Sequence, residues 1–151
     1  MKKFASILIA FVWLALATLP AAFAEDAASP IGTWVTGKGG AHIQIKDCGG
    51  KLCGTIVWLK NPLDKNGKDS VDSKNPDPSL RTRKLLGLTM LSGFAHDSDD
   101  SNVWSGGEIY NPSNGKTYSC KLTMQTPSTL LVRGYVGLSI FGETQTWTRV
   151  N

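Results

Sequence analysis

The stretch Gln145-Thr146-Trp147-Thr148-Arg149, two residues before the end of the chain, is the counterpart of Gly32-Thr33-Trp34 near its beginning. A glycine turn that leads into a tryptophan, with a distant arginine able to cover the indole ring, indicates a meeting of first and last strands. A sheet whose ends meet encloses either packed side chains or a cavity. The two motifs therefore predict a closed β-sheet, in which Trp34 and Arg149 form the structural closure of one end.

Short alternating segments separated by glycine, asparagine and proline fill the region between these motifs. No segment there has a convincing helical spacing of apolar residues, whereas evenly spaced short strands with turn signals are typical of antiparallel barrels and sandwiches. The predicted fold class is all-β, a single antiparallel up-and-down barrel of about eight strands. We expect these strands at 32–37, 41–48, 53–60, 88–95, 102–111, 116–125, 129–136 and 142–150.

Cys48 and Cys53 flank the segment Gly49-Gly50-Lys51-Leu52. A two-residue turn at Gly50-Lys51 would place the two cysteines directly opposite each other, with Cα atoms ~4.5–5.5 Å apart, which a disulfide can bridge. We therefore predict a Cys48–Cys53 disulfide. The same register places two cross-strand pairs on one face: Ile45 with Ile56, and Ile43 with Trp58.

Another alternating strand carries the third cysteine. Tyr118, Cys120, Leu122 and Met124 fall on one face of 116–125, and the residues between them fall on the other. Cys120 has no sequence neighbour with which to pair, so we expect it to be a buried thiol.

Residues 1–24 have the features of a signal peptide. Two lysines at the start precede an apolar run over 4–19, and Ala22-Phe23-Ala24 has the small-x-small pattern of a cleavage site. The run is shorter than the ~20 residues that span a bilayer core. We therefore predict a periplasmic or secreted protein with no stable membrane anchor after cleavage.

The rest of the chain divides into an N-terminal segment, 25–31, and one β-barrel domain, 32–151. Without the two leader lysines, 14 basic side chains stand against 12 acidic ones, a net charge of +2. The lysines are scattered and form no basic stripe, so we expect no nucleic-acid partner.

The segment 61–84 interrupts the strand rhythm. It is polar, contains three prolines and includes a cluster of charged and amide residues. A loop this long is uncommon in a compact domain and is often functional. Its polar side chains can instead build capped turns and local ion pairs, so the role of the cluster stays open. The cluster is Asp72, Asn75, Asp77, Arg81 and Arg83.

Short motifs spread over 32–150 support a family resemblance. They are Gly32-Thr33-Trp34, Leu52-Cys53-Gly54, Asp72 with Asn75-Pro76-Asp77-Pro78, Leu80-Arg81-Thr82-Arg83, Trp104-Ser105-Gly106-Gly107-Glu108-Ile109-Tyr110-Asn111-Pro112, Gly115-Lys116-Thr117-Tyr118, Arg133-Gly134-Tyr135 and Gln145-Thr146-Trp147-Thr148-Arg149. The chain resembles a family of small exported bacterial proteins, domain of unknown function 2147. The resemblance implies a lipocalin-like barrel, similar to lipocalins, fatty-acid-binding proteins and avidins. In that group a Gly-x-Trp packs under a late arginine, and Trp34 and Arg149 occupy those positions.

Several aromatic residues fall in the predicted strands. Aromatic walls with a few polar tips suit a small apolar or amphipathic ligand in the barrel lumen, and this is our leading functional prediction. A packed lumen is the alternative. The protein would then be an envelope protein-interaction or cell-wall-binding module acting through loop 61–84. The predicted lining residues are Trp58, Trp104, Tyr118, Met124 and Tyr135.

Catalytic and metal-binding patterns are weak. Glu108 is the best candidate acid, provided that it faces the lumen, but no nucleophile elbow or Cys-His set accompanies it. Asp64-Lys65-Asn66-Gly67 has its glycine too early for a calcium loop, and the acidic turn after His96 fits a solvated turn. We expect no enzymatic activity, no metal site and no cofactor.

Overall fold

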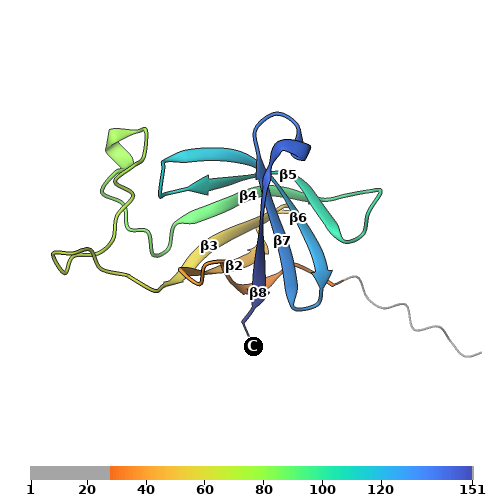
Figure 1. The fold of residues 1–151 in the computed structure, drawn as a ribbon, viewed down its shortest axis with the longest axis horizontal. Coiled ribbons are helices and arrows are strands. Elements are labelled where there is room, and N and C mark those ends of the chain that lie inside the picture. The colour runs from red at the N-terminus through yellow and green to blue at the C-terminus, as the bar shows by residue number, and fades with distance from the viewer. Residues whose placement is uncertain (1–27, 151) are drawn as a thin grey trace, which may run out of the picture.

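Eight antiparallel strands form a closed barrel in the computed structural model, which describes residues 28–150 (Figure 1). The predicted signal peptide lies outside the described residues. The strands are β1 (Gly32–Val35), β2 (Ala41–Asp47), β3 (Leu52–Leu59), β4 (Thr89–His96), β5 (Val103–Asn111), β6 (Lys116–Thr126), β7 (Thr129–Tyr135) and β8 (Glu143–Arg149). Two short 3-10 turns are η1 (Pro78–Leu80) and η2 (Ser139–Phe141). The predicted fold class is confirmed, and each strand begins and ends within two residues of its predicted position.

Strand β1 closes the barrel by pairing with β8, where Trp34 lies opposite Arg149. The Trp34 side chain is fully buried, and its Nε1 donates to the carbonyl of Pro30 at 2.8 Å. The Arg149 guanidinium carbon lies 4.3 Å from the centre of the indole ring. The same guanidinium donates to the carbonyls of Ser29, Ile31 and Pro127. One side chain of β8 thus joins the segment before β1 and the turn between β6 and β7 at the end of the barrel.

The β2–β3 hairpin contains the predicted Cys48–Cys53 disulfide, but in a different register. Both Gly49 and Gly50 have positive φ, +85° and +89°, and the Cys48 amide donates to the Lys51 carbonyl at 2.8 Å. The turn is therefore Gly49-Gly50, one residue earlier than predicted, because two glycines allow positive φ at both central positions. The cysteines sit diagonally across the hairpin, with Cα atoms 5.9 Å apart.

The facing pairs of this hairpin also differ from the prediction, and a β-bulge interrupts them between the pairs formed by Ile43 and His42. Ile43 lies opposite Ile56, and His42 lies opposite Trp58. Trp58 therefore shares a face with His42, stacks on it with ring centroids 4.4 Å apart, and is 43% exposed. The predicted pairs Ile45–Ile56 and Ile43–Trp58 are both wrong, because the earlier turn places Ile45 opposite Gly54 and Ile43 opposite Ile56. Beyond that pair the bulge leaves Val57 as an extra residue in β3, which turns Trp58 to the outer face.

Packed side chains fill the barrel interior. One contiguous cluster of fifteen buried residues runs through it, and none of them is more than 9% exposed. Two inward glycines leave room for large neighbours: a Cβ on Gly54 would lie 2.8 Å from Leu91, and one on Gly107 would lie 2.5 Å from the Phe94 ring. A ligand-sized cavity would leave accessible surface on its walls, so this part of the barrel is a core. Cys120 lies within it, fully buried, as a free thiol.

Candidate functional site

The five predicted lining residues do not come together around a cavity. Trp104 and Met124 belong to the packed core, at 9% and 4% exposure. Tyr118 is half-buried on the same inward face of β6, and its hydroxyl accepts a hydrogen bond from Nδ2 of Asn114 at 2.8 Å. These three residues occupy the interior side of the barrel, but the first two are already covered by neighbouring side chains.

Trp58 and Tyr135 lie on the outer surface, so their predicted inward orientation is wrong. The bulge at Val57 in β3 turns Trp58 outward. Tyr135 pairs with Ser119, and the inward register of β7 passes instead through Val132 and Gly134, which oppose Leu122 and Cys120. The sequence prediction grouped Tyr135 with aromatic residues of other strands, but the register of β7 was not known, so the face on which Tyr135 lies was not determined.

Loop 61–84 is folded and attached to the barrel through Asp72. This carboxylate is fully buried, yet it carries four hydrogen-bond or ion-pair contacts. Its Oδ1 accepts from the Tyr110 hydroxyl at 2.6 Å, and its Oδ2 accepts from Nδ2 of Asn75 at 2.8 Å. Nε and Nη2 of Arg83 donate to the same Oδ2 at 2.9 and 2.8 Å. We call Asp72, Asn75, Arg83 and Tyr110 the latch, because they join the loop to strand β5.

The electrostatics of the latch keep Asp72 ionised. Burial alone would raise the pKa of Asp72, but the hydrogen bonds from Tyr110, Asn75 and Arg83, together with the charge of Arg83, outweigh it and lower the pKa. The pKa of Tyr110 is raised, first by burial and then by its hydrogen bond to the carboxylate. A charge buried with this many partners is satisfied, so the latch is a structural device.

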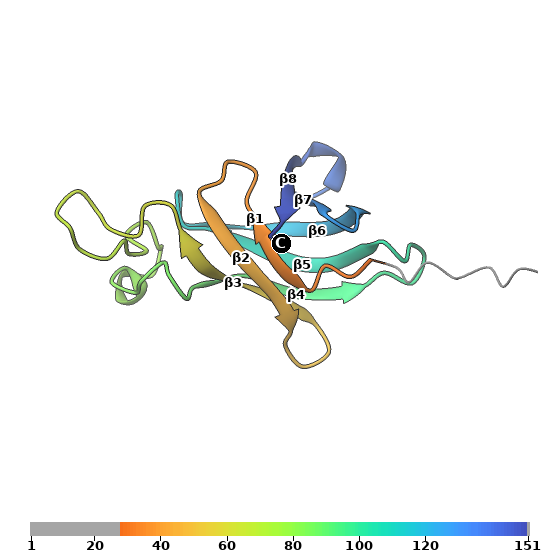
Figure 2. The ribbon, with the colours of Figure 1, turned by 90° about the horizontal axis from the view of Figure 1, so that it is seen from below.

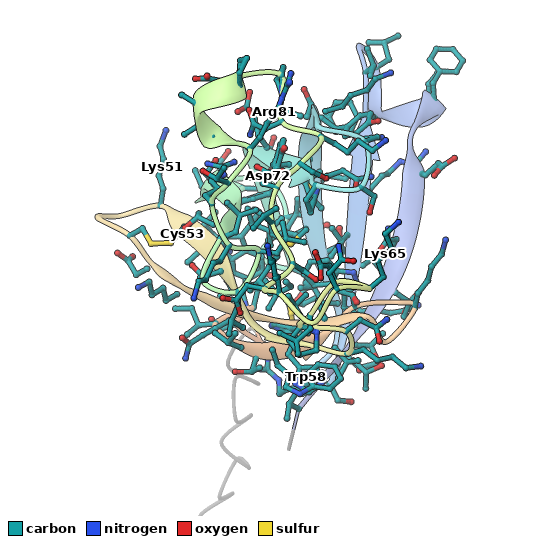
Figure 3. The ribbon with its side chains drawn as sticks, turned by 90° about the vertical axis from the view of Figure 1, so that its left-hand side faces the viewer. Lys51, Cys53, Trp58, Lys65, Asp72 and Arg81 are labelled. Carbon is teal, nitrogen blue, oxygen red and sulfur yellow. A yellow bond between two sulfur atoms is a disulfide. The ribbon has the colours of Figure 1, made fainter. Side chains whose placement is uncertain are left out.

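The other members of the predicted loop cluster support the latch. Asp77 caps η1 by accepting from the Ser79 amide and hydroxyl, and these hydrogen bonds lower the pKa of Asp77. The Asp77 amide in turn donates to Oδ1 of Asn75 at 2.9 Å. Nε of Arg81 donates to the Asn75 carbonyl at 2.7 Å. In Figure 3, Arg81 lies near the top of the molecule, Asp72 lies below it, and Trp58 lies near the bottom.

A groove of about 290 Å³ lies between the latched loop and the outer face of β4–β6. The loop forms one wall, and outward side chains of β4, β5 and β6 form the other. Glu108 lies opposite Ser92 in the β4–β5 register and is exposed. Glu108, the candidate acid provided that it faced the lumen, is thus on the outer surface. The lining residues are Asn75, Pro76, Arg83, Thr89, Met90, Ser92, Glu108, Tyr110, Gly115 and Thr117.

The close approach of the loop depends on Gly115 in the β5–β6 turn. Gly115 has φ +70°, and a Cβ there would overlap the Lys74 carbonyl oxygen. A glycine thus permits a backbone-to-backbone contact that no other residue would allow. This contact and the latch fix the loop at two points beside the groove.

Sequence reasoning missed Thr89, Met90, Ser92 and Thr117 as groove residues. Ser92 and Thr117 alternate outward on half-exposed strands, whereas Thr89 and Met90 are consecutive residues at the start of β4. Only the folded loop turns the four into a wall. The sequence feature that could have indicated the loop contact was Tyr110. It lies two residues after Glu108, and a tyrosine hydroxyl at that position can donate a hydrogen bond to a carboxylate of the loop. Among residues 28–150, no group of three or more His, Cys, Asp or Glu side chains could hold a metal ion.

The comparisons with known proteins agree with the architecture. The family model described as an uncharacterized protein conserved in bacteria, DUF2147, matches residues 32–149. A solved structure from the human pathogen Helicobacter pylori, described as belonging to the lipocalin family, is 24% identical, with a TM-score of 0.69. The alignment covers 82% of this chain and 84% of that one. This likeness shows the fold.

A search of curated proteins found no match. Within residues 28–150, none of the helices has the length and apolarity needed to cross a bilayer. The family match spans nearly the whole barrel, from the glycine of the first strand to the arginine that closes the last. The chain therefore belongs to the DUF2147 family of bacterial proteins and has a lipocalin-like barrel.

Proposed function

We propose that this protein is an exported, non-enzymatic binding protein whose site is the groove beneath loop 61–84. The observation that carries the proposal is a groove of about 290 Å³ on the outside of a barrel whose inside is filled. A barrel with a packed lumen is expected to act as a module that recognises an envelope component through its long loop.

The groove suits a short peptide that carries both an ammonium and a carboxylate group. Glu108 provides an exposed carboxylate, and within residues 28–150 no salt bridge involves it. Arg83 provides a cation whose side chain is 37% exposed beside the groove, although Asp72 shares its charge. Hydroxyl groups of Thr89, Ser92 and Thr117 add donors and acceptors between these charges. Peptides of the bacterial cell wall have this dipolar chemistry.

The lumen is the less favoured site for a ligand. Such a ligand would need the space now held by Trp104 and Met124, and nearby Leu122 and Leu130 are fully buried. Displacing packed side chains costs free energy that a small ligand must supply. The lipocalin-like fold supports ligand binding in general, and the packing favours the outer groove.

Calorimetric titration with soluble cell-wall peptides that carry free amino and carboxylate groups tests the proposal. Glu108→Gln removes the groove charge but keeps the shape, so binding should weaken by about 10- to 150-fold, the equivalent of ~1.5–3 kcal/mol for a charge-assisted hydrogen bond. Glu143→Gln is the matched control, because Glu143 is an exposed glutamate on β8 that does not line the groove. Equal binding by native protein and Glu108→Gln would contradict the proposal.

A further inference from the structure

The connection between β7 and β8 exposes an unusual amount of apolar surface. Its sequence is Val136-Gly137-Leu138-Ser139-Ile140-Phe141. The four large apolar side chains are 75%, 65%, 72% and 76% exposed, in chain order. Figures 1 and 2 show this connection projecting beyond the strands, so the patch is convex rather than a flat face. We call residues 136–141 the apolar tip.

Hydrogen bonds hold the apolar tip in its exposed position. Arg133 donates from Nε to the Ser139 carbonyl at 2.6 Å and from Nη2 to the Ile140 carbonyl at 3.1 Å. Its Nη1 donates to the Thr144 hydroxyl at 2.7 Å. Gly142 packs closely against the backbone of Gly134. The tip is therefore braced from below, and its apolar side chains cannot fold back onto the barrel without breaking these bonds.

Charge is distributed unevenly between the two ends of the barrel. In an up-and-down barrel, alternate connections lie at the same end, and the apolar tip shares its end with connections 36–40, 60–88 and 112–115. Together these four connections carry eight basic and four acidic side chains. The connections at the opposite end, 48–51, 97–102 and 127–128, carry one basic and three acidic side chains. The end with the apolar tip is therefore the positive one.

We propose that the apolar tip inserts into the surface of a lipid bilayer that contains anionic headgroups. A few apolar side chains alone give weak membrane binding, and basic groups near the same surface supply the second attraction. The connections at the same end of the barrel supply the basic side chains, seven of the eight of them in connection 60–88. The apolar tip itself is a convex projection, which suits insertion better than packing against a flat protein face. The membrane contact is separate from ligand binding in the groove, and each can fail without the other.

An environment-sensitive fluorophore on the apolar tip tests this directly. Leu138→Cys supplies the attachment thiol, while native Cys120 is fully buried, so it stays unlabelled. With vesicles of phosphatidylglycerol mixed into phosphatidylcholine, the probe emission should rise and shift to shorter wavelength. Phosphatidylcholine vesicles alone, or high salt, should reduce the response strongly, because screening weakens the electrostatic part. A probe at Ser98→Cys, in the acidic end, should not respond.

The variant Ile140→Ser with Phe141→Ser, in the labelled chain, should weaken partitioning into anionic vesicles at least about tenfold, because two large apolar side chains are lost. Val57→Ser removes an exposed apolar side chain from β3 and should leave partitioning unchanged. The proposal is overturned if the tip probe ignores vesicles or if both probes respond equally. It is also overturned if the tip probe changes with protein concentration alone, which would indicate that a second copy of the chain covers the tip.

Discussion

Replacing Tyr110 by phenylalanine removes one oxygen atom from the latch and leaves the ring in place. That hydroxyl donates to the buried Asp72 carboxylate at 2.6 Å and accepts from Nδ2 of Asn75 at 3.2 Å. The Arg83 guanidinium carbon lies 5.6 Å from the centre of the ring, and this contact remains in the variant. The substitution therefore removes the two hydrogen bonds through which the hydroxyl ties loop 61–84 to strand β5, and the bond to the charged carboxylate is the shorter of the two.

The expected loss follows from the charge of the acceptor. A hydrogen bond to an ionised group contributes about 1.5–3 kcal/mol, and Asp72 has no water-exposed surface to compensate for its loss. Arg83 and Asn75 keep their own bonds to the carboxylate, so the loop should stay folded but open more often. The free energy of loop opening should fall by about 1.5–3 kcal/mol, which makes opening about 10- to 150-fold more frequent.

Amide hydrogen exchange measures this opening. The Asp72 amide donates to the Arg83 carbonyl, and the Leu85 amide donates to the Ser70 carbonyl, both at 2.9 Å. These amides should exchange faster in Tyr110→Phe by that factor, more than amides in the core strands. Tyr118→Phe is the control, because its hydroxyl contacts Asn114 outside the latch. Unchanged loop exchange in Tyr110→Phe, or an equal change in the control, would refute the latch.

Four further outcomes are expected. Because folding lowers the pKa of Asp72, the stability that its carboxylate contributes is present above the unfolded value of 3.8 and is lost as pH falls through the lower folded pKa. Urea unfolding at pH 2–6 measures this loss. A free energy of unfolding that does not change with pH over this range would contradict the prediction. Burial raises the pKa of the Cys120 thiol to about 12, so iodoacetamide should leave it unmodified in the folded protein and label it in urea, as mass spectrometry would record. Gly107→Ala should destabilise the barrel by about 1–3 kcal/mol in urea titrations, because the new methyl group meets the Phe94 ring; tolerance would indicate free space inside. Arg149→Lys should lower the unfolding free energy by about 1–3 kcal/mol, because lysine lacks the planar fork that reaches three carbonyls.

The strands and the disulfide could be predicted because each depends on residues that are close together in the sequence. The alternation of 116–125 placed Cys120, Leu122 and Met124 on the inward face, where all three are buried. The Cys48–Cys53 spacing predicted the disulfide, although it gave the wrong turn, since a diagonal pair and a facing pair both bring the sulfur atoms together. The positions of Trp34 and Arg149 also fitted a pairing across the whole chain.

The candidate site could not be predicted to the same degree because it depends on long-range contacts. The face on which Trp58 lies changes with one bulged residue in β3, and nothing in the strand composition marks that bulge. The groove forms only when Asp72 meets Tyr110, 38 residues away in the sequence. The filling of the lumen depends on Phe94 and Leu91 occupying the space beside two glycines, a packing detail that alternation does not contain.

Chemical-shift mapping by NMR tests most directly whether the ligand site is the outer groove. A dipolar cell-wall peptide titrated into the labelled protein should move the amide signals of Ser92, Glu108 and Thr117, which line the groove. The methyl signals of Leu122 and Val132, buried inside the barrel, should stay in place. Shifts centred on those methyl groups, with the groove signals unmoved, would contradict the account and return the site to the lumen.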